Sequence, residues 1–100
     1  MYNFQQYKHS VPYGVLRSIK NFALEGGEPG GFTRAVLENN LIEAVGAADP
    51  YSLHALHDIC KVLYNELPSS IWGSPEKVRA HIKKMAEGES EVVGEGQAPL

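Results

Sequence analysis

The stretch that decides the fold is DPYSLHALHDICKVLYNE, residues 49–66. It begins with Asp49 and Pro50, an N-cap residue followed by a proline at the first helical position, where the missing N–H of proline costs nothing. Large apolar residues then recur at helical spacing, and Pro68 ends the pattern because the residue before a proline is pushed out of the helical region. The stretch therefore predicts a helix at about 50–66 with one buried stripe, formed by Leu53, Leu56, Ile59, Cys60, Leu63 and Leu67.

A second helical pattern precedes this stretch. Ser10 offers an N-cap, Pro12 falls near a first turn, and apolar residues follow on one face as far as Ala23. Glycine commonly ends a helix, so Gly26 limits this helix to about 12–25. Residues 1–10 are polar and aromatic without a period. They predict a loose N-terminal arm that could dock on a core or on a neighbouring subunit through Tyr2, Phe4 and Tyr7.

Further helical segments complete the predicted fold. An apolar pattern follows the glycine-rich connector and is interrupted at Asn39 and Asn40, where one short helix ends and another begins, since Asn tolerates the left-handed conformation. A Ser-Pro pair at 74–75 repeats the Asp-Pro start signal. The sequence therefore predicts an all-α domain over residues 11–87, a small bundle of four to five short helices with Gly/Pro-rich corners.

Composition and charge exclude several classes of protein. Hydrophobic residues make up 43% and charged residues 21% of the chain, as in ordinary globular proteins. Residues 1–85 carry nine Lys or Arg against eight Asp or Glu, a net charge of +1, which is not the basic stripe of a DNA- or RNA-binding protein. Residues 88–100 predict a disordered acidic tail. The single cysteine, the absence of an apolar run of about 18 residues and the absence of a secretory signal favour the cytoplasm, with no membrane contact.

The segment WGSPEKV (72–78) is the first candidate binding site. The N–H groups at a helix N-terminus attract anions, Lys77 could add charge, and the flat face of Trp72 could stack on a base. The alternative is structural: Ser74 caps its own helix and Trp72 fills the core between helices. The neighbouring YNELP (64–68) offers polar and aromatic groups that either contact a ligand or form an exposed helix end: Tyr64, Asn65 and Glu66.

The corner EPGGF (28–32), within the connector EGGEPGG, is the second candidate. Gly30 and Gly31 permit close approach of the backbone, and amides ahead of a helix can cradle a phosphate that Arg34 would clamp. Phe32 offers a stacking face. No predicted strand precedes the corner and its spacing is not that of a nucleotide-binding glycine loop, so a tight corner between helices is the alternative.

Side chains capable of chemistry also occur on the predicted helix at 50–66. His54 with Asp58, and His57 with Cys60, share faces at i, i+4 and i, i+3 spacing. A zinc site needs three or four convergent ligands, and the other histidines lie far off in sequence. Cys60 falls on the apolar stripe, where cysteine behaves as a small hydrophobe. The sequence therefore predicts no metal, no cofactor, no catalytic residue and a protein that is not an enzyme.

Two longer segments resemble a known family. PGGFTRAVLENNLIEAVGAAD (29–49) and YNELPSSIWGSPEKV (64–78) are similar to segments of small proteins encoded by tailed phages and bacterial prophages, and the resemblance covers about residues 11–85. It implies a small viral accessory protein in a bacterial host cell, of the kind that binds a host protein or sequesters a host signalling molecule. It implies no particular activity.

Two hypotheses for the function follow. In the first, the protein sequesters a small anionic, nucleotide-like ligand of bacterial defence signalling. In the second, it is a protein-interaction module that inhibits or assembles with a host protein, most easily as a homo-oligomer, through its aromatic arm and any exposed apolar helix face. A pocket shared by Trp72 and Arg34 would favour the first hypothesis. A Trp72 packed in the core, together with a large exposed apolar patch, would favour the second. The predicted ligand-binding residues are Gly30, Gly31, Phe32, Arg34, Tyr64, Asn65, Glu66, Trp72, Ser74 and Lys77.

Overall fold

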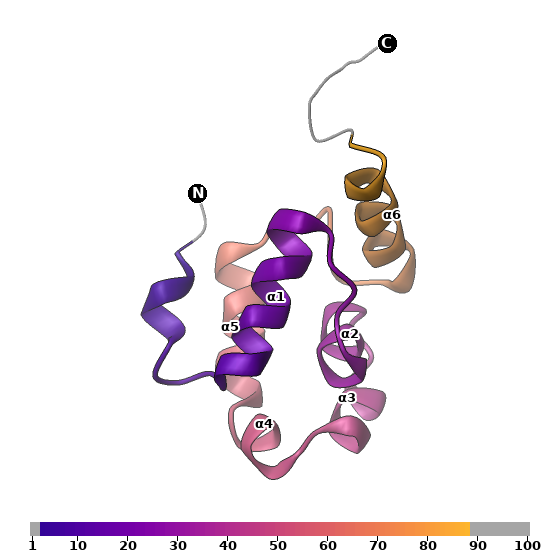
Figure 1. Cartoon of the computed structure of the whole chain (residues 1–100). Coiled ribbons are helices and arrows are strands. Elements are labelled where there is room, and N and C mark those ends of the chain that lie inside the picture. Colours follow the sequence, from indigo (N-terminus) through magenta and orange to yellow (C-terminus); the bar gives the residue numbers. More distant parts are fainter. Residues whose placement is uncertain (1–2, 89–100) are drawn as a thin grey trace.

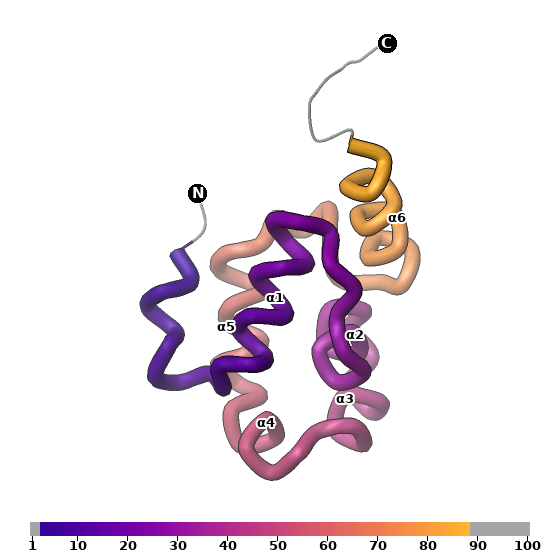
Figure 2. Tube along the Cα trace, in the orientation of Figure 1, coloured from indigo at the N-terminus to yellow at the C-terminus, as the bar shows by residue number. Residues whose placement is uncertain are grey.

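The computed structural model describes residues 3–88, and all regular structure in that part of the chain is helical (Figure 1). The prediction of an all-α bundle of short helices is confirmed, with six α-helices instead of four or five. Figure 2 shows the N-terminal 3-10 helix and the last α-helix on opposite sides of the fold. The elements are a short 3-10 helix, η1 (Phe4–Tyr7), followed by α1 (Tyr13–Glu25), α2 (Gly31–Leu37), α3 (Leu41–Ala47), α4 (Pro50–His54), α5 (Leu56–Glu66) and α6 (Pro75–Ala86).

Short polar side chains set where α3 and α4 begin. The side chain of Asn40 accepts a hydrogen bond from the N–H of Glu43 (3.3 Å), and that of Asp49 accepts one from the N–H of Ser52 (2.7 Å). Each satisfies an amide that the first turn of a helix leaves without a partner. Asn39 has a φ of 63°, the left-handed conformation, and it separates α2 from α3 as the sequence predicts.

Two predicted helix boundaries were wrong. Ser10 does not cap α1, because its hydroxyl donates to the carbonyl of Tyr7 (3.4 Å) and the helix begins only after Pro12. The single helix predicted over 50–66 is divided at Ala55, whose φ of −92° and ψ of 7° depart from helical values. The chain changes direction between α4 and α5 at this residue (Figure 1).

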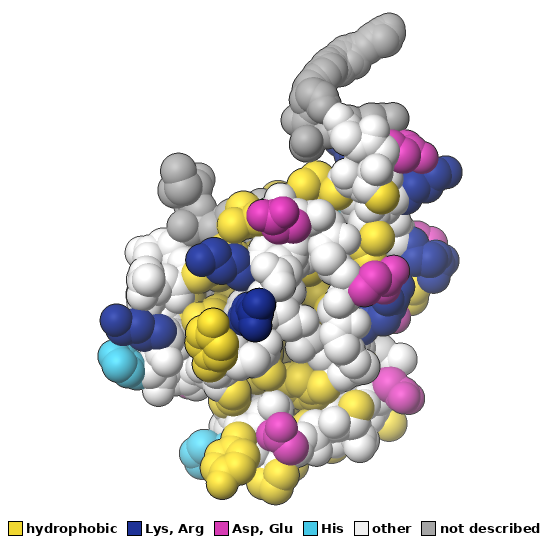
Figure 3. Space-filling view, viewed as in Figure 1, with side chains coloured by type: hydrophobic (Ala, Val, Ile, Leu, Met, Phe, Trp, Pro, Cys, Tyr) yellow, Lys and Arg dark blue, Asp and Glu magenta, His cyan; other side chains and the backbone are white. Residues whose placement is uncertain are grey.

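The buried stripe predicted for this segment holds within α5 but fails at two positions. Leu53 belongs to α4, on the other side of the division, and is 46% exposed. Cys60 is exposed because Ile59, Val62 and Leu63 form the core-facing side of α5, which leaves position 60 outside. Hydrophobic side chains reach the surface at other places as well (Figure 3).

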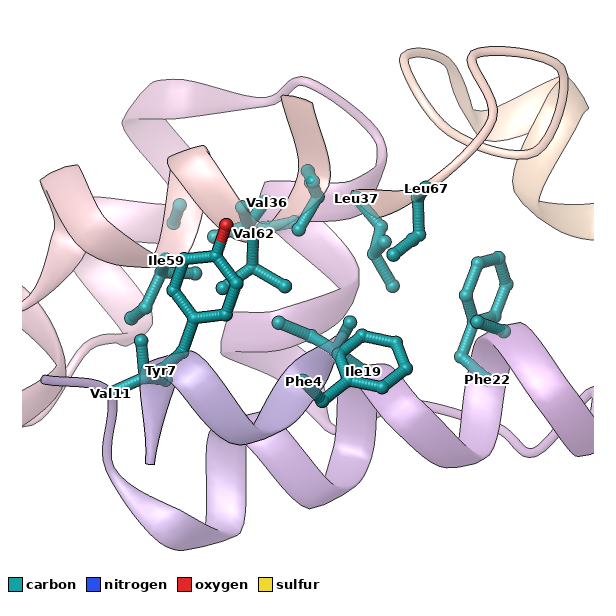
Figure 4. Close-up of a cluster of buried hydrophobic side chains, with 14 of the residues drawn as sticks. Phe4, Tyr7, Val11, Ile19, Phe22, Val36, Leu37, Ile59, Val62 and Leu67 are labelled. Carbon is teal, nitrogen blue, oxygen red and sulfur yellow. The ribbon is translucent and has the colours of Figure 1, made fainter. Parts of the chain in front are cut away.

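One apolar core joins segments from the whole described chain (Figure 4). Phe4 and Tyr7 of η1 are buried in it with Ile19 of α1 and Ile59 of α5, so the N-terminal segment docks on the core of its own chain. η1 contacts both α1 and α5, α1 contacts α2, and α2 contacts α3. The largest fully buried side chains are Phe22, Ile19, Leu37, Ile59, Val62 and Val78.

The end of α1 depends on Gly26. This residue has a φ of 71°, its N–H donates to the carbonyl of Phe22 (3.0 Å), and the N–H of Gly27 donates to the carbonyl of Asn21 (3.1 Å). These bonds close the helix in the manner typical of a C-terminal glycine. A Cβ at Gly26 would overlap the Cβ of Met85, so glycine also lets α6 approach α1.

Replacement of Gly26 by alanine should therefore destabilise the fold. The left-handed conformation and the overlap with Met85 together should lower the free energy of unfolding by about 1–3 kcal/mol, measured by urea denaturation. Gly14→Ala is the matched control, because a Cβ in this first turn of the same helix meets no atom within 4 Å. That variant should be neutral or more stable by up to about 1 kcal/mol. Equal losses in the two variants would contradict the role given to Gly26.

Candidate functional site

The segment WGSPEKV forms the turn between α5 and α6 and the start of α6. The indole N–H of Trp72 donates to the carbonyl of Leu67 (3.2 Å), and its partly buried ring packs against the core. The N–H of Gly73 donates to the carbonyl of Leu37 at the end of α2 (2.7 Å). Gly73 has a φ of 111°, which strongly favours glycine. The turn is thereby fixed to both α5 and α2.

Ser74 and Lys77 have their own partners in this turn. The hydroxyl oxygen of Ser74 accepts from the N–H of Lys77 (3.2 Å) and so caps α6. The ammonium group of Lys77 donates to the carbonyl of Ser69 (3.0 Å). This arrangement matches the structural alternative raised for the motif, and anion binding at this helix start stays a prediction.

Arg34, the cation predicted to clamp a phosphate beside Gly30 and Gly31, is paired with two carboxylates. Its Nη1 lies 2.6 Å from Oε1 of Glu28 and its Nε lies 2.9 Å from Oε2 of Glu38. Hydrogen bonds to Glu28 and then to Glu38 raise the pKa of Arg34 above its ordinary value. The guanidinium therefore keeps its charge, but that charge is neutralised within the fold.

The glycine corner lines a surface hollow of about 540 Å³. Its lining comes from α1, the start of α2, the end of α3 and the start of α4 with the link between them. Asp49 is the one charged side chain among the described residues that line it, and a carboxylate repels a phosphate. Of the predicted site, the lining includes Gly30, Gly31 and Phe32 but not Arg34, Trp72, Ser74 or Lys77.

Glu66, which the sequence offered as a ligand contact or an exposed helix end, anchors the N-terminal segment. Its Oε1 accepts from the N–H of Asn3 (2.9 Å), and its Oε2 accepts from the amide of Gln6 (2.8 Å) and the hydroxyl of Tyr7 (3.3 Å). The side-chain amide of Asn65 donates to the same hydroxyl (3.4 Å). The last turn of α5 thus holds η1 in place.

Loss of the Glu66 carboxylate should loosen this attachment. Hydrogen bonds to a charged acceptor stabilise more than neutral ones, but these are partly exposed, so Glu66→Ala should lower the free energy of unfolding by about 1–2 kcal/mol. Amide hydrogen exchange over residues 4–11 should accelerate as well. Glu76→Ala is the matched control, because within the described residues this exposed carboxylate is paired only with Arg79, at 4.0 Å. An unchanged exchange rate at 4–11 would show that η1 is held without Glu66.

The ten predicted residues therefore occupy separate places. Gly30, Gly31 and Phe32 line the hollow, and Arg34 is bound to carboxylates. The end of α5 faces the N-terminal segment through Asn65 and Glu66, while Tyr64 is 80% exposed. The remaining three belong to the turn before α6: Trp72, Ser74 and Lys77.

The histidines and the cysteine serve other purposes. Within residues 3–88, no group of three or more His, Cys, Asp or Glu side chains could hold a metal ion. The ring of His81 lies 4.8 Å from that of Phe22, and its Nε2 lies 2.8 Å from the carbonyl oxygen of Phe22, so this histidine joins α6 to α1. Neighbouring atoms partly remove the exposed Cys60 thiol from water, which raises its pKa and disfavours the reactive thiolate.

Sequence reasoning missed how many of the large apolar side chains in residues 41–53 are exposed. In the described part of the chain, eight large apolar side chains are exposed, and five of them lie within residues 41–53. Residues 41–47 span less than two helical turns, so their apolar pattern alone does not fix which face of the helix meets the core. We call these five residues the 41–53 surface: Leu41, Ile42, Val45, Tyr51 and Leu53.

No protein-family model, curated protein or solved structure matches this chain. None of the described helices is both long and apolar enough to cross a bilayer. The resemblance to phage and prophage proteins stays a prediction, and any function has to be inferred from the chemistry of the surfaces.

Proposed function

We propose that this protein is a protein-interaction module that pairs with a second copy of itself through the 41–53 surface. The observation that supports the proposal is the exposure of α3. Leu41, Ile42 and Val45 are 61%, 80% and 42% exposed, and Ala44 is the one buried residue of this helix. Apolar area that leaves water on association contributes about 25 cal/mol per Å², so a cluster of this kind favours a partner.

The chemistry of the surface suits a second copy. Residues 41–53 contain Glu43 and Asp49 but no Lys or Arg, so no strong charge pattern selects a different protein. In a two-fold symmetric pair the same apolar patch is contributed from both sides. Gly46 of α3 is exposed, and a Cβ built there would meet no other part of the fold within 4 Å, so a helix of the second copy has room to approach this position closely.

Capture of a small anion has less support from the geometry. Arg34 is paired with Glu28 and Glu38, and the ammonium group of Lys77 binds a carbonyl of its own turn. The hollow beside the glycine corner carries Asp49 instead of a cation. The groups that would hold phosphate are therefore used within the fold.

Sedimentation equilibrium of Ile42→Asp beside the wild type tests the proposed pairing. The wild type should be a dimer, and a carboxylate in place of Ile42, an apolar side chain of this surface that is 80% exposed, should weaken dimerisation at least about tenfold, or about 1.4 kcal/mol. Tyr64→Asp is the matched control, since Tyr64 on α5 is equally exposed at 80% but lies outside the 41–53 surface. A monomeric wild type, or equal weakening by both substitutions, would contradict the proposal.

A further inference from the structure

A groove of about 660 Å³ lies between η1 and α1, on elements that do not contribute to the 41–53 surface. Its apolar lining includes Tyr13, Leu16 and Leu24, which recur at helical spacing along α1. Tyr13 is 77% and Leu24 44% exposed, so water contacts much of this lining. In Figure 3, basic side chains over η1 and α1 flank a hydrophobic surface.

Three basic side chains line the same groove: Lys8, Arg17 and Lys20. All three residues are exposed. Within residues 3–88 the basic side chains that form ion pairs are those of Arg34 and Arg79, so none of the three groove cations has such a partner. No Asp or Glu is among the described residues that line the groove. Three cations around one groove repel each other, and a bound anionic group would relieve this repulsion.

The groove therefore suits a partner that combines negative charge with apolar side chains. A small inorganic anion would leave Leu16 and Leu24 in contact with water. A peptide that contains both carboxylates and aliphatic side chains would satisfy both halves of the lining. The chain itself contains such a segment at residues 89–95, which read ESEVVGE and lie outside the described part.

We propose that this groove binds residues 89–95 of the same chain. The segment supplies three carboxylates for the three cations, from Glu89, Glu91 and Glu95. Val92 and Val93 supply apolar side chains small enough to lie along the surface of α1. The charges of the two partners are equal in number and opposite in sign.

The position of α6 brings the segment within reach. The last turn of α6 touches the end of α1, because Met85 lies directly against Gly26, two residues from Leu24 at one end of the groove. The groove follows α1 from Leu24 to Tyr13, a distance of about 16 Å at 1.5 Å per residue. The twelve residues after Gly88 can span up to about 40 Å when extended.

Zero-length carbodiimide cross-linking of the full-length protein, followed by mass spectrometry, tests the proposal. This reagent joins a lysine to a carboxylate only when the two are in contact. Cross-links should join Lys8 or Lys20 to Glu89, Glu91 or Glu95, and they should be lost at about 1 M salt, where charges are screened beyond about 3 Å. Lys61, exposed on α5 and outside the groove, supplies the background yield. Cross-links no more frequent than this background would overturn the proposal.

Two further arms identify the binding site and its occupant. Arg17→Gln removes a groove cation without removing a reactive lysine, and should reduce the Lys8 and Lys20 cross-links several-fold. Arg79→Gln removes an exposed cation of α6 outside the groove and should leave these cross-links unchanged. Equal reductions in the two variants would attribute the cross-links to overall charge and overturn the proposal. Mixed ¹⁴N- and ¹⁵N-labelled protein should give cross-linked peptides of one isotope each. Peptides of mixed isotope would show binding of a second copy and overturn attachment within one chain. The result is independent of the proposed dimer, because the same experiment can be run on Ile42→Asp.

Discussion

The attachment of η1 to the end of α5 is the interaction on which the rest of the fold depends. Glu66 accepts three hydrogen bonds from the N-terminal segment, and Phe4 and Tyr7 are buried behind that contact. The α-helices contain only five to thirteen residues, and helices of this length are marginal on their own in water. In a chain of 100 residues the core is small, so two aromatic side chains from one short segment are a substantial part of it. The groove between η1 and α1 also exists only because η1 is held there.

The turn between α5 and α6 shows how residues typical of binding sites can serve the fold instead. A helix N-terminus presents amides that need an acceptor, and either a ligand or a capping side chain can provide one. Ser74 provides it here, Trp72 donates to Leu67, and Gly73 reaches Leu37 on another helix. The same few residues therefore join α2, α5 and α6. Hydrogen-bond donors that already have a partner bind an anion less readily. The apolar and basic surfaces are therefore the better candidates for a binding site.

The sequence predicted those parts of the fold that local chemistry determines. Asp49, Ser74 and Gly26 mark helix ends through bonds to residues three or four positions away, and such signals are visible in sequence. The division at Ala55 carries no proline or glycine signal. The exposure of Cys60 depends on which side of α5 meets the core, and that choice is made by tertiary packing.

The candidate site was harder to predict because it too depends on tertiary packing. Glycine, tryptophan and arginine indicate what a site could contain, but whether distant residues converge is a property of the folded chain. Arg34 pairs with Glu28 and Glu38, which are close to it in sequence. Of these two pairs, the one with Glu38 has the i, i+4 spacing that the sequence makes visible. The bonds of Glu66 span about sixty residues and left no pattern to detect.

The two surfaces that remain differ in the physical force that would drive binding. The 41–53 surface is apolar and its segment lacks cations, whereas the groove carries three of them. Salt screens contacts between exposed charges but does not weaken apolar contacts in this way, and strongly hydrated salts such as sulfate strengthen them. A rise in ionic strength should therefore release an acidic segment from the groove while the paired 41–53 surfaces stay together. Because the groove and the 41–53 surface lie on different helices, a substitution in one of them need not alter binding at the other. One small core can in this way support two contacts of opposite salt dependence.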